Sequence, residues 1–538
     1  MKEKGNISIN TENIFPIIKK FLYSDQDIFL RELVSNAVDA TQKIKSLSQM
    51  GELKEEIGDL KIEVILDKKK KTITISDKGI GMSAEEIKKY INQIAFSGAT
   101  EFVEKYKEKG DSQQIIGHFG LGFYSAFMVS SYVEIKSKSY VKNKKAAYWK
   151  CDGNTEFEIK ESDKKGRGTE VILHINDDSK EFLEESKVNE ILNRYCKFLP
   201  VEIKFGQKDE SVEDGKDKEG KPKHKTVKVD NIVNNPNPIW NKSPKDLTDD
   251  DYKAFYKELY PFSEEPLFWI HLNVDYPFNL TGILYFPKIK NDFEVQKNKI
   301  QLYSRQVFIT DEVKDVVPEF LMLLHGIIDS PDIPLNVSRS YLQSDGNVKK
   351  INTYITKKVA DKLNELFKDE RKEFDNKWKD INLFVKYGMI SEEKFYEKVE
   401  SLALFESVDG KMRTIDEYKK HIAKTQKDKD KNHIILYTSD LDKQDSFIQD
   451  AKNRNYDVVI FNNVIDSHYI NHLEQKLDKV QIKRVDSDIL DKLIDKGDKK
   501  ETVISDKDKE KLKGIFDKII NNKSTVVSVE ALSPQDNP

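Results

Sequence analysis

Residues 28–44 read IFLRELVSNAVDATQKI, and this stretch decides how the first part of the chain folds. Its apolar residues recur at the spacing of one helix face, so we expect an amphipathic helix from Ile28 to Ile44. Glu32 and Asn36 are four residues apart and would project from the same face. A carboxylate beside an amide suits a water-activating base next to a magnesium ligand, and an ordinary helix edge is the alternative.

The next segments predict strands. KIEVILD (61–67) and TITISD (72–77) alternate with period two across a lysine turn, which predicts a hairpin, and 132–137 and 170–175 are further strand candidates. Helices on a mostly antiparallel sheet define an α+β fold. Strand parity puts Asp77 on the core side, where a carboxylate needs a donor such as an adenine amino group. Gly79 and Gly81 would let the backbone approach that base, although a β-turn with a capping Asp is the alternative.

Two glycine-containing segments follow. Gly117-His-Phe-Gly120-Leu-Gly122-Phe123 leads into an expected helix over YSAFMV, and glycines before a helix can cradle phosphates with backbone N–H groups. A flexible loop is the alternative. Gly166-Arg-Gly168-Thr169 is a turn entering a strand, with a hydroxyl that could contact a base or hold water.

Composition bounds the class of protein. The chain has 538 residues, 38% apolar and 34% charged, which predicts several folded domains. A net charge of −4 argues against a protein that coats nucleic acid, and we expect no nucleic-acid partner. Cys151 and Cys196 match no metal or disulfide spacing, and no stretch has the apolar length of a membrane span, so we expect a cytoplasmic protein without a membrane partner.

Organisation along the chain follows from composition. Thirteen of the 22 residues from 207 to 228 are charged, which predicts a solvated linker. We therefore expect a first domain over 1–206, a charged linker over 207–231, a second domain over 232–504 and the start of a third over 505–538. In the second domain we expect strands at 266–274, 280–287 and 302–310, helices at 316–324 and 348–374, and a fresh α/β pattern from 432. In the third we expect a helix at 509–520 and a strand at 525–531.

The four segments around Glu32, Asp77, Gly117 and Thr169, in this order, resemble the GHKL ATPase superfamily. Much longer stretches, such as YSDQDIFLRELVSNAVDA, IIGHFGLGFYSAFMVS, NPIWNKSPKDLTDDDYKAFYKELY and GIIDSPDIPLNVSRSYLQ, are similar to bacterial HtpG-type heat shock protein 90 chaperones. The resemblance implies a GHKL (Bergerat) α/β sandwich that binds ATP, an α/β middle domain and a partial C-terminal domain. It also implies a slow ATPase whose cycle acts on partly folded client proteins.

The resemblance assigns roles by matching positions. Glu32 would activate water, Asn36 would hold Mg²⁺, and Asp77, supported by Thr169, would accept from adenine. Arg339 would reach the γ-phosphate from the second domain, positioned by Asn336 and Gln343. The remaining nucleotide-binding residues would line the pocket or end a lid that starts near residue 93: Gly81, Met82, Gly117, Gly120, Gly122 and Phe123.

The sequence departs from the family pattern in the lid and at the C-terminus. Phe96 replaces a common lid lysine, Ala99 a threonine, and Tyr90 an Asn or His near the ribose, so these three stay outside the predicted site. The dimerisation domain would continue past Pro538, so we expect a truncated chain that is a monomer or weak dimer where the full-length protein is a homodimer. Trp240, Phe268 and Trp269 are candidates for client contact, with burial in a core as the alternative.

Two other functions stay open at this point. A DNA-processing GHKL enzyme would show DNA-stimulated ATPase activity and salt-dependent DNA binding. A nucleotide-gated scaffold would bind partners without meaningful hydrolysis. Histidine kinases of the superfamily are disfavoured by Glu32, because they lack the general base.

Overall fold

The computed structural model describes residues 25–53, 56–94, 96–98, 101–102, 115–117, 120–154, 156–216, 222–288, 300–314, 316–335, 346–497, 504–520, 525–527 and 529. The chain divides into two compact units. Unit 1 comprises Met1–Tyr285, Gln296–Val317 and Leu324–Asn352, and unit 2 comprises Phe286–Val295, Pro318–Leu323 and Thr353–Pro538. None of the helices in these described ranges has both the length and the apolar character of a membrane span.

A mixed sheet of eight strands forms the first part of unit 1, in the order β5-β4-β3-β6-β2-β1-β7-β8. Its neighbours pair antiparallel except β1 and β7, which run parallel. The predicted hairpin is confirmed, with Leu66 opposite Ile73 and Ile65 opposite Thr74. The strands are β1 (Ile62–Asp67), β2 (Thr72–Ser76), β3 (Ser130–Lys138), β4 (Ala147–Cys151), β5 (Phe157–Glu161), β6 (Gly168–Ile175), β7 (Ile203–Lys216) and β8 (Pro222–Ile232).

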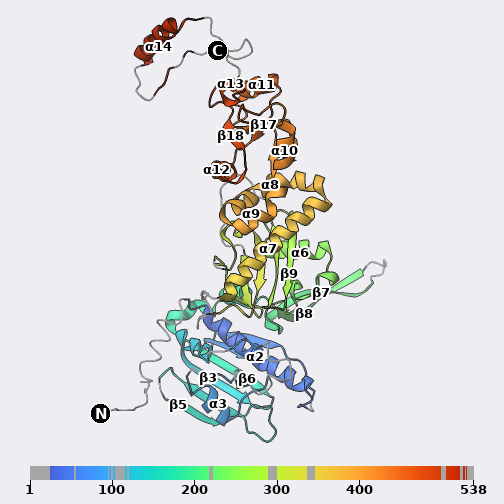
Figure 1. Cartoon of the computed structure of the whole chain (residues 1–538). Coiled ribbons are helices and arrows are strands. Elements are labelled where there is room, and N and C mark those ends of the chain that lie inside the picture. Colours follow the sequence, from blue (N-terminus) through green and yellow to red (C-terminus); the bar gives the residue numbers. More distant parts are fainter. Residues whose placement is uncertain are drawn as a thin grey trace, which may run out of the picture. The chain divides into compact units, whose positions relative to one another are not determined.

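Helices cover one face of this sheet and confirm the α+β pattern. The predicted helix is α2 (Ile28–Gln49), which lies against the sheet (Figure 1). It packs on β1, β2 and β6 and buries its apolar face. The short α3 (Ala84–Tyr90) starts with a capping box, in which the Ser83 hydroxyl accepts from the Glu86 N–H and the Glu86 carboxylate accepts from the Ser83 N–H. The other helical elements here are η5 (Gly122–Met128), η6 (Asp177–Leu183) and α5 (Glu185–Tyr195).

Two expectations for this part of the chain are refined. The helix expected after Gly122 is present as a 3₁₀ helix, η5. The charged segment 207–231, expected as a solvated linker, pairs as the β7–β8 hairpin, in which residues 207–212, 224–226 and 228 are exposed. Cross-strand neighbours explain the pairing: Asp209 lies opposite Lys228, and the β-branched Val229 lies opposite Lys208.

A second sheet in unit 1 has the strand order β12-β11-β13-β10-β9. The predicted strand 302–310 is two strands, because Arg305 and Gln306 turn the chain with positive φ angles of 51° and 63°. The elements are η7 (Ile239–Asn241), η8 (Pro244–Asp246), α6 (Asp249–Leu259), β9 (Phe268–Val274), β10 (Leu280–Phe286), β11 (Ile300–Ser304), β12 (Val307–Thr310) and β13 (His325–Asp329).

The aromatic residues considered for client contact belong to the packing of this region. Trp240 and Phe268 are buried, and Trp269 is half-buried and stacks on Tyr252 with ring centroids 5.1 Å apart. The alternative of burial in a core is therefore the one that the structure supports for Trp240 and Phe268.

Unit 2 is helical, with a small parallel sheet in the order β17-β16-β18 that confirms the α/β pattern expected from 432. The helix predicted at 348–374 is interrupted at Glu370, and the one predicted at 316–324 is a 3₁₀ turn, η9 (Glu319–Leu321). Residues 525–527 form no strand, and the rest of the strand expected at 525–531 lies almost entirely outside the described residues. The elements of the C-terminal part are α7 (Gly346–Asp369), α8 (Arg371–Ser391), α9 (Glu393–Val399), η10 (Glu400–Leu402), β14 (Leu404–Glu406), β15 (Met412–Thr414), α10 (Ile415–Ile422), β16 (His433–Thr438), α11 (Asp445–Asn453), β17 (Val458–Ile460), α12 (Asp466–Lys476), β18 (Val480–Arg484), α13 (Leu490–Leu493) and α14 (Asp506–Ile520).

Gly81 generates a stability prediction. Its φ is +61°, and a Cβ there would overlap the carbonyl oxygen of Lys138 on β3. We expect Gly81→Ala to lower the free energy of unfolding by at least about 2 kcal/mol, from backbone strain and displaced packing. Gly166→Ala is the matched control, because a Cβ at Gly166 would contact nothing within 4 Å. Urea unfolding followed by circular dichroism measures both, and equal stability of the two variants would contradict the prediction.

Candidate functional site

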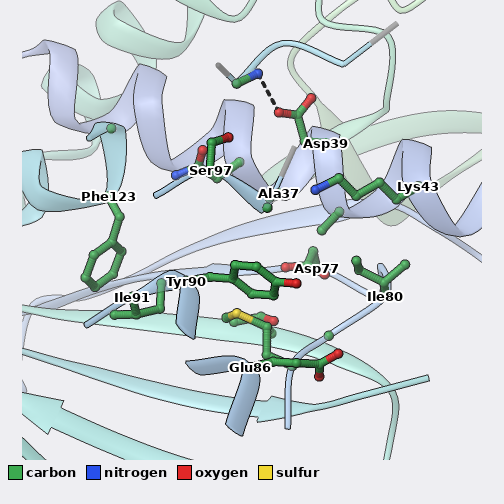
Figure 2. A pocket seen from close by; sticks show the side chains of 18 of the residues that line it. Ala37, Asp39, Lys43, Asp77, Ile80, Glu86, Tyr90, Ile91, Ser97 and Phe123 are labelled. Carbon is green, nitrogen blue, oxygen red and sulfur yellow. Dashed lines mark hydrogen bonds between the residues drawn. The ribbon is translucent and has the colours of Figure 1, made fainter. Parts of the chain in front are cut away.

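A cavity of about 390 Å³ lies in unit 1 between α2 and the eight-stranded sheet (Figure 2). It brings together all four segments singled out in the sequence. Arg339, Asn336 and Gln343 lie outside the described residues, so their placement stays a prediction. The predicted site residues that line the cavity are Glu32, Asn36, Asp77, Gly81, Met82, Gly117, Gly120, Gly122, Phe123 and Thr169.

One face of helix α2 forms one wall of the cavity. Glu32, Asn36 and Lys43 all line the cavity, as their helical spacing requires. From Ile28 to Asp39 every residue is buried except Asn36, which is exposed toward the cavity. The amide of Asn36 is therefore accessible to a ligand, whereas its helical neighbours are packed.

The carboxylate of Glu32 is held in place by the preceding residue. Glu32 is 4% exposed, and its Oε1 accepts two hydrogen bonds from Arg31, from Nε at 3.0 Å and from Nη2 at 2.8 Å. The other oxygen, Oε2, lies against Gly122, where a Cβ would come within 2.6 Å of it. The glycine thus leaves room for one oxygen of Glu32 beside the loop.

Asp39 fixes the glycine-containing loop to α2, a role that the sequence analysis missed. Its Oδ1 accepts from the backbone N–H of Ile116 and its Oδ2 from that of Gly117, each at 2.7 Å (a bond of this kind is dashed in Figure 2). The only signal in the sequence is its place on the helix face of Glu32 and Asn36, seven and three residues on. The bidentate contact sets the distance between Asn36 and the start of the loop.

Asp77 follows β2 on the opposite wall and confirms the parity argument. It is 5% exposed, and its Oδ1 accepts from the backbone N–H of Gly79 at 2.7 Å. Burial raises the pKa of Asp77 to about 7, against the opposing effect of the Gly79 hydrogen bond. The cavity therefore contains a buried carboxyl group that a hydrogen-bond donor of a ligand would favour in its ionised form.

Thr169 supports this wall through its backbone and its hydroxyl. Its carbonyl oxygen accepts from the N–H of Asp77 at 2.9 Å. Its hydroxyl lies 2.8 Å from that of Ser137, whose Oγ also accepts from the N–H of Met82 at 2.8 Å. The expectation that Gly79 and Gly81 open space for a base is refined, because a Cβ at either position would first overlap the protein backbone, at Ala40 and Lys138 respectively.

The wall around α3 is aromatic. Tyr90 and Phe96 both line the cavity, although the sequence analysis left them out of the site, and Ala99 lies outside the described residues. Their rings stack with centroids 6.0 Å apart. Glu101 accepts hydrogen bonds from the Tyr90 hydroxyl at 3.0 Å and from Lys89 at 2.8 Å. Ring stacking therefore connects Tyr90 to Phe96, and hydrogen bonds connect Tyr90 and Lys89 to Glu101.

The raised pKa of Asp77 predicts how stability depends on pH. The folded protein binds this proton more tightly than the unfolded chain, so wild-type stability falls as pH rises through the interval from about 4 to 7. Asp77→Asn cannot titrate yet keeps an acceptor for the Gly79 N–H. We expect the wild type to lose roughly 2–3 kcal/mol relative to this variant between pH 5 and pH 7.5, measured by urea unfolding at both pH values. A difference that stays constant with pH would show that Asp77 titrates normally.

Comparisons with known proteins agree with this geometry. The sequence model described as histidine kinase-, DNA gyrase B- and HSP90-like ATPase matches residues 24–178, and the Hsp90 protein model matches residues 204–534. The chain is 56% identical to the chaperone protein htpG of Bacteroides fragilis strain 638R, covering 100% of this chain and 77% of the relative.

Two further relatives point the same way. Identity is 58% to the HtpG chaperone of Bacteroides thetaiotaomicron, over 96% of this chain and 74% of the relative. It is 32% to an endoplasmin homolog of Hordeum vulgare, over 89% of this chain and 66% of the relative. The matched residues cover both the cavity and unit 2, and we conclude that the chain belongs to the Hsp90 family, with a GHKL-type ATPase domain at its N-terminus.

Proposed function

We propose that the cavity beneath α2 is where this ATP-dependent molecular chaperone binds and hydrolyses ATP. The observation that carries the proposal is the convergence on one cavity of ten predicted residues from four segments of the chain, with the buried carboxyl group of Asp77 across from the accessible amide of Asn36. Each wall offers a different chemistry, which suits a ligand with a purine at one end and phosphates at the other.

The base would bind at Asp77. The buried carboxylate of Asp77 can accept a further hydrogen bond beside the one from Gly79, and the amino group of adenine could donate it. The Thr169–Ser137–Met82 hydrogen bonds hold the backbone of this wall in one arrangement, so the acceptor is fixed before the ligand arrives.

The phosphates would lie between α2 and the loop of Gly117, Gly120 and Gly122. Mg²⁺ retains several waters and takes few protein ligands when phosphates supply the rest, so one exposed amide oxygen at Asn36 fits it. Within the described ranges no group of three or more His, Cys, Asp or Glu side chains could hold a metal by itself. When bound, Mg²⁺ would neutralise phosphate charge.

Hydrolysis would use Glu32 as the general base. Its Oε1 is fixed by Arg31, and its Oε2 lies next to Gly122, where a water facing the terminal phosphate would lose its proton to this carboxylate. Arg339 from the second domain would contact the γ-phosphate, with Asn336 and Gln343 positioning it, so that hydrolysis waits for domain closure.

The wider role follows from the family and is proposed for this chain. Its partners would be partly folded client proteins in the cytoplasm, and the full-length protein would act as a homodimer. A DNA-processing role receives no support, since the Hsp90 model covers residues 204–534, the part where a DNA-processing enzyme of the superfamily would differ.

Glu32→Gln tests the catalytic role. The amide keeps an acceptor for Arg31 and cannot take a proton, so we expect ATP affinity within about threefold of wild type and steady-state hydrolysis lower by roughly 10²–10⁴-fold. Calorimetry and phosphate release measure the two quantities. Glu158→Gln on the exposed strand β5 is the control and should leave both unchanged. Wild-type turnover in Glu32→Gln would remove Glu32 from this role.

Arg339→Ala tests the contribution of the second domain. Because the guanidinium would act on the γ-phosphate in the closed state, we expect unchanged ADP affinity and a hydrolysis rate lowered at least about tenfold. The exposed Arg194 provides the control, and Arg194→Ala should hydrolyse ATP at the wild-type rate. If Arg339→Ala also hydrolyses at that rate, no arginine at this position assists catalysis.

A further inference from the structure

Helix α5 is joined to the start of α2 by two polar contacts. Lys187 donates to the carboxylate of Asp27 at 3.0 Å, and the hydroxyl of Tyr195 donates to the carboxylate of Asp25 at 3.2 Å. Lys187 and Tyr195 are eight residues apart, a spacing that returns to the same face of a helix. One face of α5 therefore lies against the chain just ahead of Glu32.

The ring of Tyr195 lies beside the guanidinium group of Arg31. Arg31 is 1% exposed, and its Cζ lies 5.6 Å from the centroid of the Tyr195 ring. The same guanidinium group donates two hydrogen bonds to Oε1 of Glu32. At this distance the electrons of an aromatic ring attract a cation, and the attraction is stronger where water is excluded. The ring therefore stabilises the group that fixes the Glu32 carboxylate.

Tyr195 is itself held in one position. It is 4% exposed, and its hydroxyl is bonded to Asp25. Burial raises the pKa of Tyr195 to about 12, so the ring stays neutral and the hydroxyl remains a donor at neutral pH. A second guanidinium group, that of Arg194, has its Cζ 5.0 Å from the same ring centroid. The ring thus offers Arg31 a fixed surface.

The second sheet of unit 1 contacts the same ring. Phe308 on β12 packs against Tyr195 edge to face, with ring centroids 5.8 Å apart and an angle of 63° between the ring planes. Both residues are buried and belong to one hydrophobic core that extends from α2 to β13. Contacts between side chains therefore run without a break from the cavity to β12, in the order Glu32, Arg31, Tyr195 and Phe308.

We propose that Tyr195 is a positioning residue for ATP hydrolysis, which holds the guanidinium group of Arg31 so that Glu32 keeps its orientation. Tyr195 does not line the cavity, so it acts through Arg31 and not on the nucleotide. Phe308 supports the ring from the second sheet. The inference rests on the proposed role of Glu32 as general base and extends it, because the orientation of the base then depends on packing outside the cavity. A displacement of about 1 Å in a catalytic group can lower a rate about 100-fold.

Steady-state ATP hydrolysis and calorimetric ADP binding by the 538-residue chain test this role. Tyr195→Leu removes the ring. We expect kcat to fall roughly 10-fold or more, with KM and ADP affinity within about twofold of wild type. Tyr195→Phe keeps the ring and loses only the hydrogen bond to Asp25, so we expect it to retain at least about a third of the wild-type kcat.

Phe308→Leu tests the contact with the second sheet, and we expect it to lower kcat about threefold. In the variant with both leucines, kcat should stay within about twofold of Tyr195→Leu alone, because the first substitution already removes the contact. Tyr148→Leu on β4 is the matched control. Its ring also lies near a cation, with the Lys160 nitrogen 4.6 Å from the centroid, but it does not line the cavity. This control should hydrolyse ATP and bind ADP as the wild type does.

A wild-type kcat in Tyr195→Leu would overturn the inference. A folded Tyr195→Leu variant, as judged by circular dichroism, that loses ADP affinity as much as kcat would also overturn it, because the ring would then shape the whole cavity. Should Tyr195→Leu not fold, Phe308→Leu decides, and a wild-type kcat there overturns the inference. Effects that multiply in the double variant would overturn the link to the second sheet. A wild-type protein that does not hydrolyse ATP would instead overturn the proposed function.

Discussion

The carboxyl group of Asp77 is buried at the end of β2, at a point where little water reaches and the N–H of Gly79 donates to it. Burial raises the pKa of Asp77 to about 7, so the protein holds an acidic group in an unfavourable setting near neutral pH. A ligand that donates a hydrogen bond to this group stabilises its ionised form and offsets part of the free-energy cost of burying it. That gain in free energy contributes to ligand binding. The rest of the site is arranged around this acceptor: β6 fixes its backbone through Thr169, and α2 faces it with Asn36.

Several acidic side chains of this cavity would lie near the phosphates and would repel them unless their charge is compensated. Glu32 is paired with Arg31, Glu101 with Lys89, and Asp39 with two backbone N–H groups. These donors compensate most of the negative charge of the three carboxylates within the protein. A metal ion at Asn36 would then meet the phosphates, while Glu32 keeps one oxygen beside Gly122 for chemistry.

The spacing of apolar residues along the sequence predicted those parts of the site whose structure depends on neighbouring residues in the chain. Helical spacing located α2, and strand alternation located β1 and β2 and turned Asp77 toward the core. Contacts that depend on a distant partner were missed, because nothing near Asp39 shows that it will bind the N–H of Ile116, and nothing near Tyr90 shows that it will stack on Phe96. Likewise, composition predicted exposure for 207–231 but could not show that its two halves pair as β7 and β8.

A crystal structure with ADP and Mg²⁺ would test the central claim most directly, because it locates both ends of the ligand at once. The account predicts the adenine amino group within hydrogen-bonding distance of the Asp77 carboxylate and the metal bound to the side-chain oxygen of Asn36. Nucleotide bound elsewhere on the chain, or a cavity that stays empty at saturating ADP, would contradict it.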